Sequence, residues 1–331
     1  MKLDDHFDVL LKDTVNLGQD KLDQLDGRVN AIYKALRSDA EIGPLITGKS
    51  PQGSWPQRTI IEPVSGNEFD ADFMLNMSEV EDWADSPKKY IDKVYAALDR
   101  HTTYGTMPHA RKCRCVRVVY ANSMHVDIVP HLILADGREV IVNRDDDDWE
   151  ETNPQGFTDW MREKDSITGG NLRKVIRLLK FLRDHKNTFT GTRSIIITTL
   201  LGERAEEWRK VFDPGYYGSV PTALLHLVKD LDEWLQGRPS LPQIMIPNGD
   251  GATFNHRWNE TSYRYFRERI HVHANEIQAA YEEPDKERSV RLWQGVFGDG
   301  FKAPAPTTNS VKFAPSAASA ATVVGRSGRA G

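Results

Sequence analysis

Three aspartates interrupt short apolar segments that otherwise have the composition of β-strands. Asp70 and Asp72 lie in EFDADFML, which begins at Glu68, and Asp127 lies in MHVDIVP, which begins at Met124. Side chains alternate along a strand, so positions 70 and 72 share a face about 7 Å apart. If a neighbouring strand brings Asp127 to that face, three carboxylates gather, and such a cluster needs cations. Magnesium fits best, with manganese as a substitute, because it prefers carboxylate and phosphate oxygens.

The alternative interpretation is that each aspartate is a surface residue on a half-exposed strand. The segment GKSPQGSWPQRT, which begins at Gly48, is rich in Gly, Pro and Ser and is predicted to be a loop. Its Gly-Ser pair, Gly53 and Ser54, lies just upstream of the acids and favours the joint site. Glycine lets a backbone approach phosphate closely, and a serine hydroxyl with adjacent amides can hold it. Two ions about 4 Å apart can activate an attacking oxygen and stabilise a leaving phosphate. Alone, a Gly-Ser pair is only a turn.

The pattern of apolar residues predicts an α/β (α+β) chain in two parts. Residues 1–40 have helical spacing, with Gly18 and Gly27 as points where the helix can be interrupted. A strand, helix, strand, strand order over 60–135 predicts a small mixed sheet with helices on one side. The second part is mainly helical, with amphipathic segments starting at residues 170, 193, 221 and 259. We therefore expect a catalytic lobe with its N-terminal helix over 1–150, a helical lobe over 151–302 and a flexible tail over 303–331.

Charge and cysteine content exclude several classes of protein. The chain has 331 residues, 43 Lys plus Arg against 48 Asp plus Glu and a net charge of −5, which argues against a protein that coats nucleic acid. Its apolar runs are far shorter than the ~18 residues of a membrane span. Cys113 and Cys115 are the only cysteines, which excludes a disulfide framework or a four-cysteine zinc site and suits a reducing cytoplasm.

These motifs resemble a known family. QGSWPQRT, EFDADF and HVDIVP resemble the G-S, D-x-D, D pattern of the polymerase-β-like nucleotidyltransferase fold, which pairs a mixed-sheet lobe with a helical lobe around a nucleotide cleft. The spacing is most similar to the cGAS/DncV-like nucleotidyltransferases (CD-NTases), the signalling enzymes of bacterial CBASS antiphage defence. The resemblance covers roughly residues 45–300. Its motifs are fairly specific for the superfamily and less specific for the product.

The resemblance implies a cyclic oligonucleotide synthase. Such an enzyme joins ATP, GTP or other nucleoside triphosphates into a cyclic di- or trinucleotide, releases pyrophosphate and signals to an effector protein. Asp70 and Asp72 would hold magnesium, and Asp127 would complete the metal site and help to deprotonate the ribose hydroxyl. The donor triphosphate would be held by five further residues: Gln52, Gly53, Ser54, Lys180 and Ser194.

The helix that carries Lys180 supports this role independently. In LRKVIRLLKFLRDHK, Arg173, Arg177 and Lys180 are spaced i, i+4 and i+7 on one face, opposite an apolar stripe. Three cations on one face suit a triphosphate groove. A solvated basic face is the alternative. Together with the aspartates, the pattern favours the phosphate role for Lys180 and leaves Arg173 and Arg177 open.

Two other functions remain possible from the sequence. An enzyme of the same fold that extends an RNA 3′ end, or makes linear oligonucleotides, should carry a basic RNA-binding surface, which the charge of −5 disfavours. A nucleotide-binding scaffold that has lost catalysis should lack an aspartate, and all three are present. The zinc insertion that senses DNA in the animal enzyme has no counterpart among two cysteines, so we expect no DNA activator.

The C-terminal segment ends in GRSGRAG, with Gly331 last. It loosely resembles the tails of ubiquitin-like modifiers and of CD-NTases whose operons encode a ubiquitin-transferase-like partner. A terminal glycine is sterically open at its carboxylate, so the resemblance implies that Gly331 can be conjugated to another protein. The alternative is an inert, disordered terminus.

Overall fold

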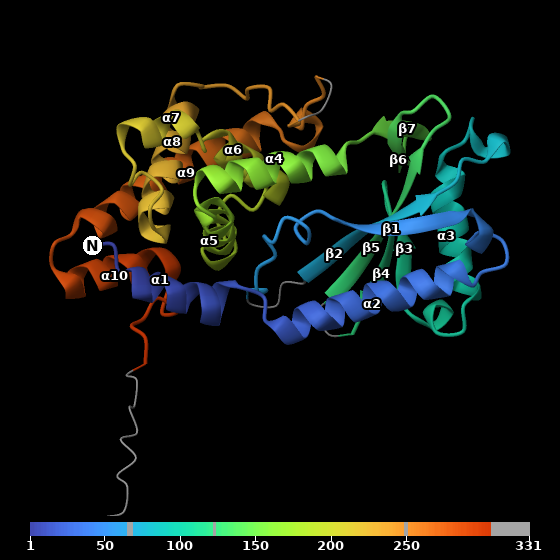
Figure 1. The fold of residues 1–331 in the computed structure, drawn as a ribbon, viewed down its shortest axis with the longest axis horizontal. Helices are drawn as coiled ribbons and strands as arrows, with labels where there is room; N and C mark the ends of the chain where they lie inside the picture. The colour runs from blue at the N-terminus through green and yellow to red at the C-terminus, as the bar shows by residue number, and fades with distance from the viewer. Residues whose placement is uncertain (65–68, 122–123, 248–250, 306–331) are drawn as a thin grey trace, which may run out of the picture.

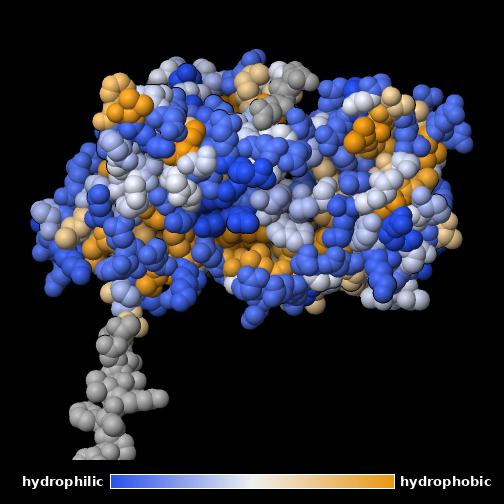
Figure 2. Space-filling model, in the orientation of Figure 1, coloured by the Kyte–Doolittle hydropathy of each residue, from blue (hydrophilic) through white to orange (hydrophobic). Residues whose placement is uncertain are grey.

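A sheet and a group of helices lie side by side along the longest axis of the molecule (Figure 1). This computed structural model describes residues 1–64, 69–121, 124–247 and 251–305, with the backbone alone at Phe69 and Asp70. On the face drawn in Figure 2, strongly hydrophilic residues gather where the two parts meet. Among the described helices, none is long and apolar enough to cross a membrane.

One mixed sheet carries the seven strands of the described residues, in the order β1-β2-β5-β4-β3, with β6 beside β5 and β7 beside β6. The strands are β1 Ile46–Gln52, β2 Phe69–Met77, β3 His109–Arg111, β4 Val116–Tyr120, β5 Met124–Ile133, β6 Glu139–Asn143 and β7 Asp148–Glu151. The β2–β5 pair is parallel and the other pairs are antiparallel. The expected mixed sheet is therefore confirmed.

Two helices cover one face of this sheet, α2 (Gln19–Arg37) and α3 (Lys88–Arg100) (Figure 1). Their apolar side chains meet those of Ala71, Phe73 and Leu75 from β2 in one buried cluster, which we call the sheet core. Full burial of each large apolar side chain stabilises the fold by about 1.5–3 kcal/mol. Because strand side chains alternate, the opposite face of β2 carries the even-numbered residues, and this face has no helix of the sheet core on it.

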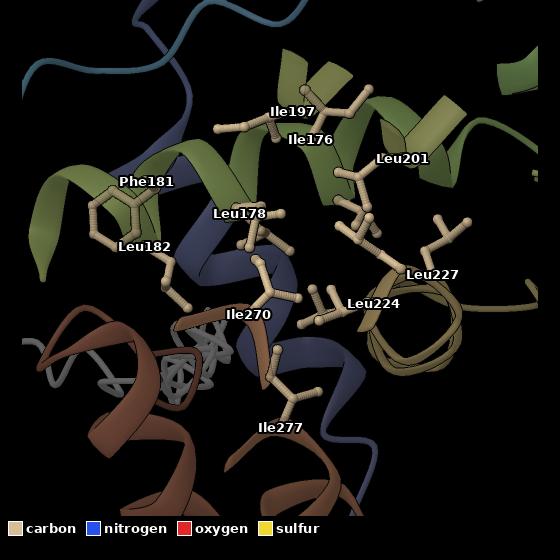
Figure 3. Close-up of a cluster of buried hydrophobic side chains, with 14 of the residues drawn as sticks. Ile176, Leu178, Phe181, Leu182, Ile197, Leu201, Leu224, Leu227, Ile270 and Ile277 are labelled. Atoms are coloured by element: carbon tan, nitrogen blue, oxygen red, sulfur yellow. The ribbon is translucent and has the colours of Figure 1, made fainter. Parts of the chain in front are cut away.

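The second half of the chain forms a helical core. Its helices are α4 Pro154–Ile167, α5 Asn171–His185, α6 Ser194–Glu203, α7 Glu207–Phe212, α8 Val220–Gln236, α9 Glu260–Glu282 and α10 Lys286–Phe297. Figure 3 shows Leu178, Leu224 and Ile270, from α5, α8 and α9, pointing toward one another. The segments expected from residues 170, 221 and 259 are helices. The helix expected from residue 193 is α6, which ends at Glu203, and the separate short helix α7 follows it.

The N-terminal residues form two helices, and the break between them at residues 16–18 includes Gly18, one of the two glycines expected to interrupt the helical pattern. Helix α1 (Asp4–Leu10) runs into a π turn (Leu11–Val15), and α2 begins only after Gly18. Phe7 packs edge-on against Trp293 of α10, with ring centroids 4.9 Å apart, so α1 belongs to the helical core. The two N-terminal helices turn their apolar faces to different cores, which a single straight helix cannot do. The boundaries near 150 and 302 stay predictions, and residues 306–331 of the tail lie outside the described residues.

Candidate active site

The parallel β2–β5 pair brings the sequence-predicted aspartates into register. Asp72 lies directly opposite Asp127, and the backbone of Asp70 lies opposite His125. Residues opposite one another in a parallel pair point to the same face, which here is the face turned away from the sheet core. Asp127 is only 8% exposed and Asp72 is half-buried. The neighbouring strand required by the sequence hypothesis is therefore β5.

An arginine that the sequence analysis missed holds the third aspartate. Arg117 of β4 lies opposite Asp127 of β5, and its Nε and Nη2 donate to the two carboxylate oxygens at 2.7 Å each. A bidentate pair of this kind combines strength with fixed geometry. The signal was present in RCVRVVY, where one charged residue stands among valines, the same pattern that singled out the aspartates.

The pairing of Arg117 with Asp127 leads to a prediction about cation binding. Arg117→Met leaves the buried carboxylate of Asp127 without its counter-charge. The midpoint of thermal unfolding in EDTA should therefore fall, and the free energy of unfolding should decrease by about 1–3 kcal/mol. A divalent cation competes with the guanidinium for Asp127, so added magnesium should raise the midpoint of the variant more than that of the wild type. Arg111→Met, which removes a β3 arginine paired with Asp92, is the control. An equal magnesium response in the wild type and Arg117→Met would contradict the competition.

The loop that follows β1 touches the acids. Gln52, the last residue of β1, lies opposite Asp72. Gly53 has a φ of +68°, and a Cβ added there would lie 2.6 Å from Oδ2 of Asp72. Position 53 therefore requires glycine for both its backbone conformation and its space. Ser54 starts a turn in which its carbonyl accepts from the amide of Thr59 at 3.0 Å.

Cys115 lies beside the same acids but is not a thiolate ligand. The residue is buried, and burial raises the pKa of its thiol, which the nearby carboxylates of Asp127 and Asp72 raise further. The thiol therefore stays protonated at neutral pH, and a metal site here depends on carboxylate oxygens. Cys113 and Cys115 are both free, as expected.

The other two predicted phosphate ligands come from the helical core. Lys180 of α5 is 6% exposed, and its Nζ donates to the carbonyl of Thr59 at 2.7 Å. Ser194 is the first residue of α6, and its Oγ accepts from Nη1 of Arg183 at 3.2 Å. The structure thus brings Lys180 to the loop that carries Gly53 and Ser54. It places Ser194 at the contact between α5 and α6.

The donor set fits a magnesium ion. Asp72 and Asp127 present carboxylates on one face of two adjacent strands. Asp70 lies two residues before Asp72 in the same strand. Hard oxygen ligands of this kind suit magnesium or manganese better than softer metals. The guanidinium of Arg117 supplies positive charge to the carboxylate of Asp127, which is the kind of charge that a divalent cation would supply.

Acids on a parallel strand pair, with a glycine turn packed against one of them, are the arrangement expected from the resemblance to nucleotidyltransferases. Comparison with known families agrees, because residues 1–165 match the SMODS family, described as the Second Messenger Oligonucleotide or Dinucleotide Synthetase domain. The chain belongs to the cGAS/DncV-like nucleotidyltransferases, the CD-NTases, whose class of reaction is the synthesis of cyclic oligonucleotides.

Three similar proteins span nearly the whole chain. A c-di-GMP synthase of Roseivirga ehrenbergii is 24% identical over 87% of this chain and 82% of its own. A cyclic AMP-AMP-AMP synthase of Acinetobacter is 21% identical over 89% of this chain and 83% of its own. The solved structure of Escherichia coli CdnC with ATP has a TM-score of 0.69 at 20% identity, covering 92% of this chain and all of that one. The last comparison establishes the shared fold.

Proposed function

We propose that this protein condenses nucleoside triphosphates, ATP and/or GTP or others, into a cyclic di- or trinucleotide second messenger. The observation that carries the proposal is the register of Asp72 against Asp127, with Gly53 packed on Asp72. The relatives described above make a cyclic dinucleotide and a cyclic trinucleotide, and CdnC binds ATP. Both kinds of product are therefore within the proposal.

Asp70, Asp72 and Asp127 would hold magnesium, or manganese in its place. When bound, the ion supplies positive charge against the phosphates and against the charge that develops during transfer. Asp127 accepts the proton of the attacking ribose hydroxyl. The ribose oxygen then forms a bond to the α-phosphorus, the α–β phosphoanhydride bond breaks, and pyrophosphate leaves. A second transfer of the same kind closes the ring of a cyclic dinucleotide, and a cyclic trinucleotide takes a third.

Gln52, Gly53 and Ser54 would cradle the donor triphosphate, assisted by Lys180 and Ser194. The positive φ of Gly53 and the absence of a Cβ allow a phosphate to approach the backbone closely. An ammonium group has three N–H donors, so Lys180 can donate to Thr59 and to a phosphate together.

Incubation with labelled nucleotides and magnesium, resolved before and after phosphatase, tests the proposal. Cyclic products should resist phosphatase, because they have no terminal phosphate. Linear products, which would indicate the RNA-extending or linear alternative, should lose their terminal phosphates to phosphatase and change mobility. A scaffold without catalysis should form no product. Either of the last two outcomes would overturn cyclic synthesis by this chain.

The proposal extends to antiphage signalling in the cytoplasm, where nucleoside triphosphates are available. The product would activate a cyclic-nucleotide-responsive effector protein, and no DNA activator would be required. Family membership supports this role. Cells that carry the enzyme with its effector should restrict phage, and cells that carry the enzyme with both Asp70 and Asp72 replaced by asparagine should not. Equal restriction of phage by the two kinds of cell would mean that synthesis by this enzyme has no part in the defence.

Conjugation of Gly331 is a separate proposal about the tail, which lies outside the described residues. A ubiquitin-transferase-like partner would activate the C-terminal glycine and join it to another protein, and this would prime synthesis. Gly331→Glu should leave basal synthesis in vitro unchanged and remove higher-mass forms of the protein from cells. Unaltered higher-mass forms in cells with Gly331→Glu would rule out conjugation through this residue.

A further inference from the structure

One face of α5 donates hydrogen bonds to three consecutive backbone carbonyls of the 53–59 loop. Nε of Arg173 lies 2.9 Å from the carbonyl oxygen of Gln57, and Nη1 of Arg177 lies 2.6 Å from that of Arg58. Nζ of Lys180 lies 2.7 Å from that of Thr59. The cations follow the loop in the same order as the carbonyls, so residues 57–59 run along this face of α5.

Spacing explains how a helix can follow an irregular segment in this way. A helix rises about 1.5 Å per residue, so steps of four and three residues separate the cations by about 6 Å and 4.5 Å along the axis. Successive peptide units repeat about every 3.3 Å in an extended chain and more closely in a turn such as this one. Long arginine and lysine side chains can bridge this small mismatch. The i, i+4, i+7 pattern that suggested a phosphate groove is thus also suited to a parallel backbone segment.

The loop itself transmits this contact to Ser54. The amide of Arg58 donates to the carbonyl of Trp55, and the amide of Thr59 donates to the carbonyl of Ser54, each at 3.0 Å. Holding residues 57–59 therefore also holds the start of the turn. The side chain of Gln57 is buried and donates through Nε2 to Oγ1 of Thr158 in α4 at 3.0 Å, so a second helix holds the same segment.

The backbone of Arg58 needs such support. Its φ of +55° lies in the left-handed region, which is unfavourable for a residue with a Cβ and persists only where the surroundings enforce it. Arg177 donates to the carbonyl of this same residue. Hydrogen bonds from a charged donor are roughly twice as strong as neutral ones, so this contact is well suited to stabilise the conformation.

Arg173 is itself held in place by the carboxylate of Asp165, near the start of α5. Nη1 of Arg173 pairs with Oδ2 of Asp165, and the backbone amide of Arg173 donates to Oδ1 of the same carboxylate at 3.0 Å. Asp165 is 7% exposed and comes from α4. The arginine therefore reaches the loop from an anchored position, and two helices of the helical core define where the carbonyl of Gln57 lies.

We propose that Arg173 and Arg177 are positioning residues for the reaction, which clamp the 53–59 loop so that Gly53 and Ser54 are set against Asp72. The negative ends of three peptide groups face α5, where cations neutralise them. The loop is thus held by the helical core, although β1 places its start in the sheet. This inference rests on the proposed function, because the clamp serves catalysis only if the loop receives the donor triphosphate.

Arg177→Met tests the clamp, since methionine keeps an apolar stem and removes the donor. Lys174→Met is the matched control, because Lys174 lies on the same helix and donates to Asn171 of that helix. Without nucleotide, hydrogen exchange at the amides of Arg58 and Thr59 should become about tenfold faster in Arg177→Met and stay unchanged in Lys174→Met. The KM for the nucleoside triphosphate should rise about tenfold, with a smaller change in kcat. Arg177→Lys should restore part of both.

Two results would overturn the inference. A higher KM in Arg177→Met with unchanged exchange in the nucleotide-free protein would mean that Arg177 contacts the phosphate and does not hold the loop. A lower melting temperature with unchanged exchange at the two amides and unchanged KM would mean a purely structural role. Failure of the proposed function gives a different result, because the wild type would then form no cyclic product. The exchange measurement would still show whether Arg177 holds the loop.

Discussion

Replacement of both Asp70 and Asp72 by asparagine is expected to reduce cyclic product formation to background. The two carboxylates are the proposed ligands of magnesium, whose charge stabilises the transition state by several kcal/mol. At about 1.4 kcal/mol per tenfold in rate, their loss corresponds to a decrease of about a thousandfold or more. Asp127 alone cannot replace them, because it is one of three proposed metal ligands and also carries the charge that pairs with Arg117. Product formed from labelled nucleotides is the measurement.

Stability should change in the opposite direction. Removing carboxylates from a face that already holds Asp127 relieves repulsion in the metal-free protein, so the melting temperature of the double variant should equal or exceed that of the wild type. Asp145→Asn with Asp146→Asn, two exposed acids in the loop after β6, is the charge-matched control and should leave synthesis intact. Normal turnover by the Asp70 and Asp72 variant would remove the basis of the assignment.

Lys180→Ala should raise the KM for nucleoside triphosphate by about tenfold to a hundredfold. A hydrogen bond to a charged group is worth about 1.5–3 kcal/mol, and Lys180 is proposed to donate to the donor phosphates. Lower kcat is also expected if the phosphate contact tightens during transfer. Steady-state kinetics with varied nucleotide, at saturating magnesium, give both constants.

Because Lys180 is buried and bonded to Thr59, its removal can also weaken the fold. Lys180→Met fills the space of the stem and separates the two effects. If Lys180 binds phosphate, both variants should show the raised KM, while Lys180→Met should be the more stable. If the melting temperature falls and the folded fraction binds nucleotide as the wild type does, Lys180 is structural and the phosphate role is wrong.

The sequence was sufficient to predict the acid pair because alternation along a strand is a local property. Asp70 and Asp72 in β2 and Asp127 in β5 stand in segments whose apolar neighbours identify them as strands. The choice of β5 as the partner of β2 could not follow from that pattern. It depends on α3 and β4, which separate the two strands along the chain and allow them to pair in parallel.

Strand β1 was predicted as a loop because its composition is unlike that of a strand. Gly48 and Pro51 lie within it, and proline cannot donate to a ladder. In the structure β1 is the edge strand beside β2, where a missing donor is tolerated. The partners of Lys180 and Arg177 could not be foreseen either, because the carbonyls of residues 57–59 carry no signature in the sequence.

The placement of α1 has a consequence for the order in which the molecule forms during synthesis. Phe7 is synthesised long before the rings against which it packs, which belong to Trp293, Phe297 and Phe301. At about 5–20 residues per second, translation separates these partners by roughly 15 to 60 seconds. The sheet core, whose members all lie between Leu17 and Trp149, is complete long before then. Helix α1 is therefore made long before α10, and the helical core can close only after α10 has been synthesised.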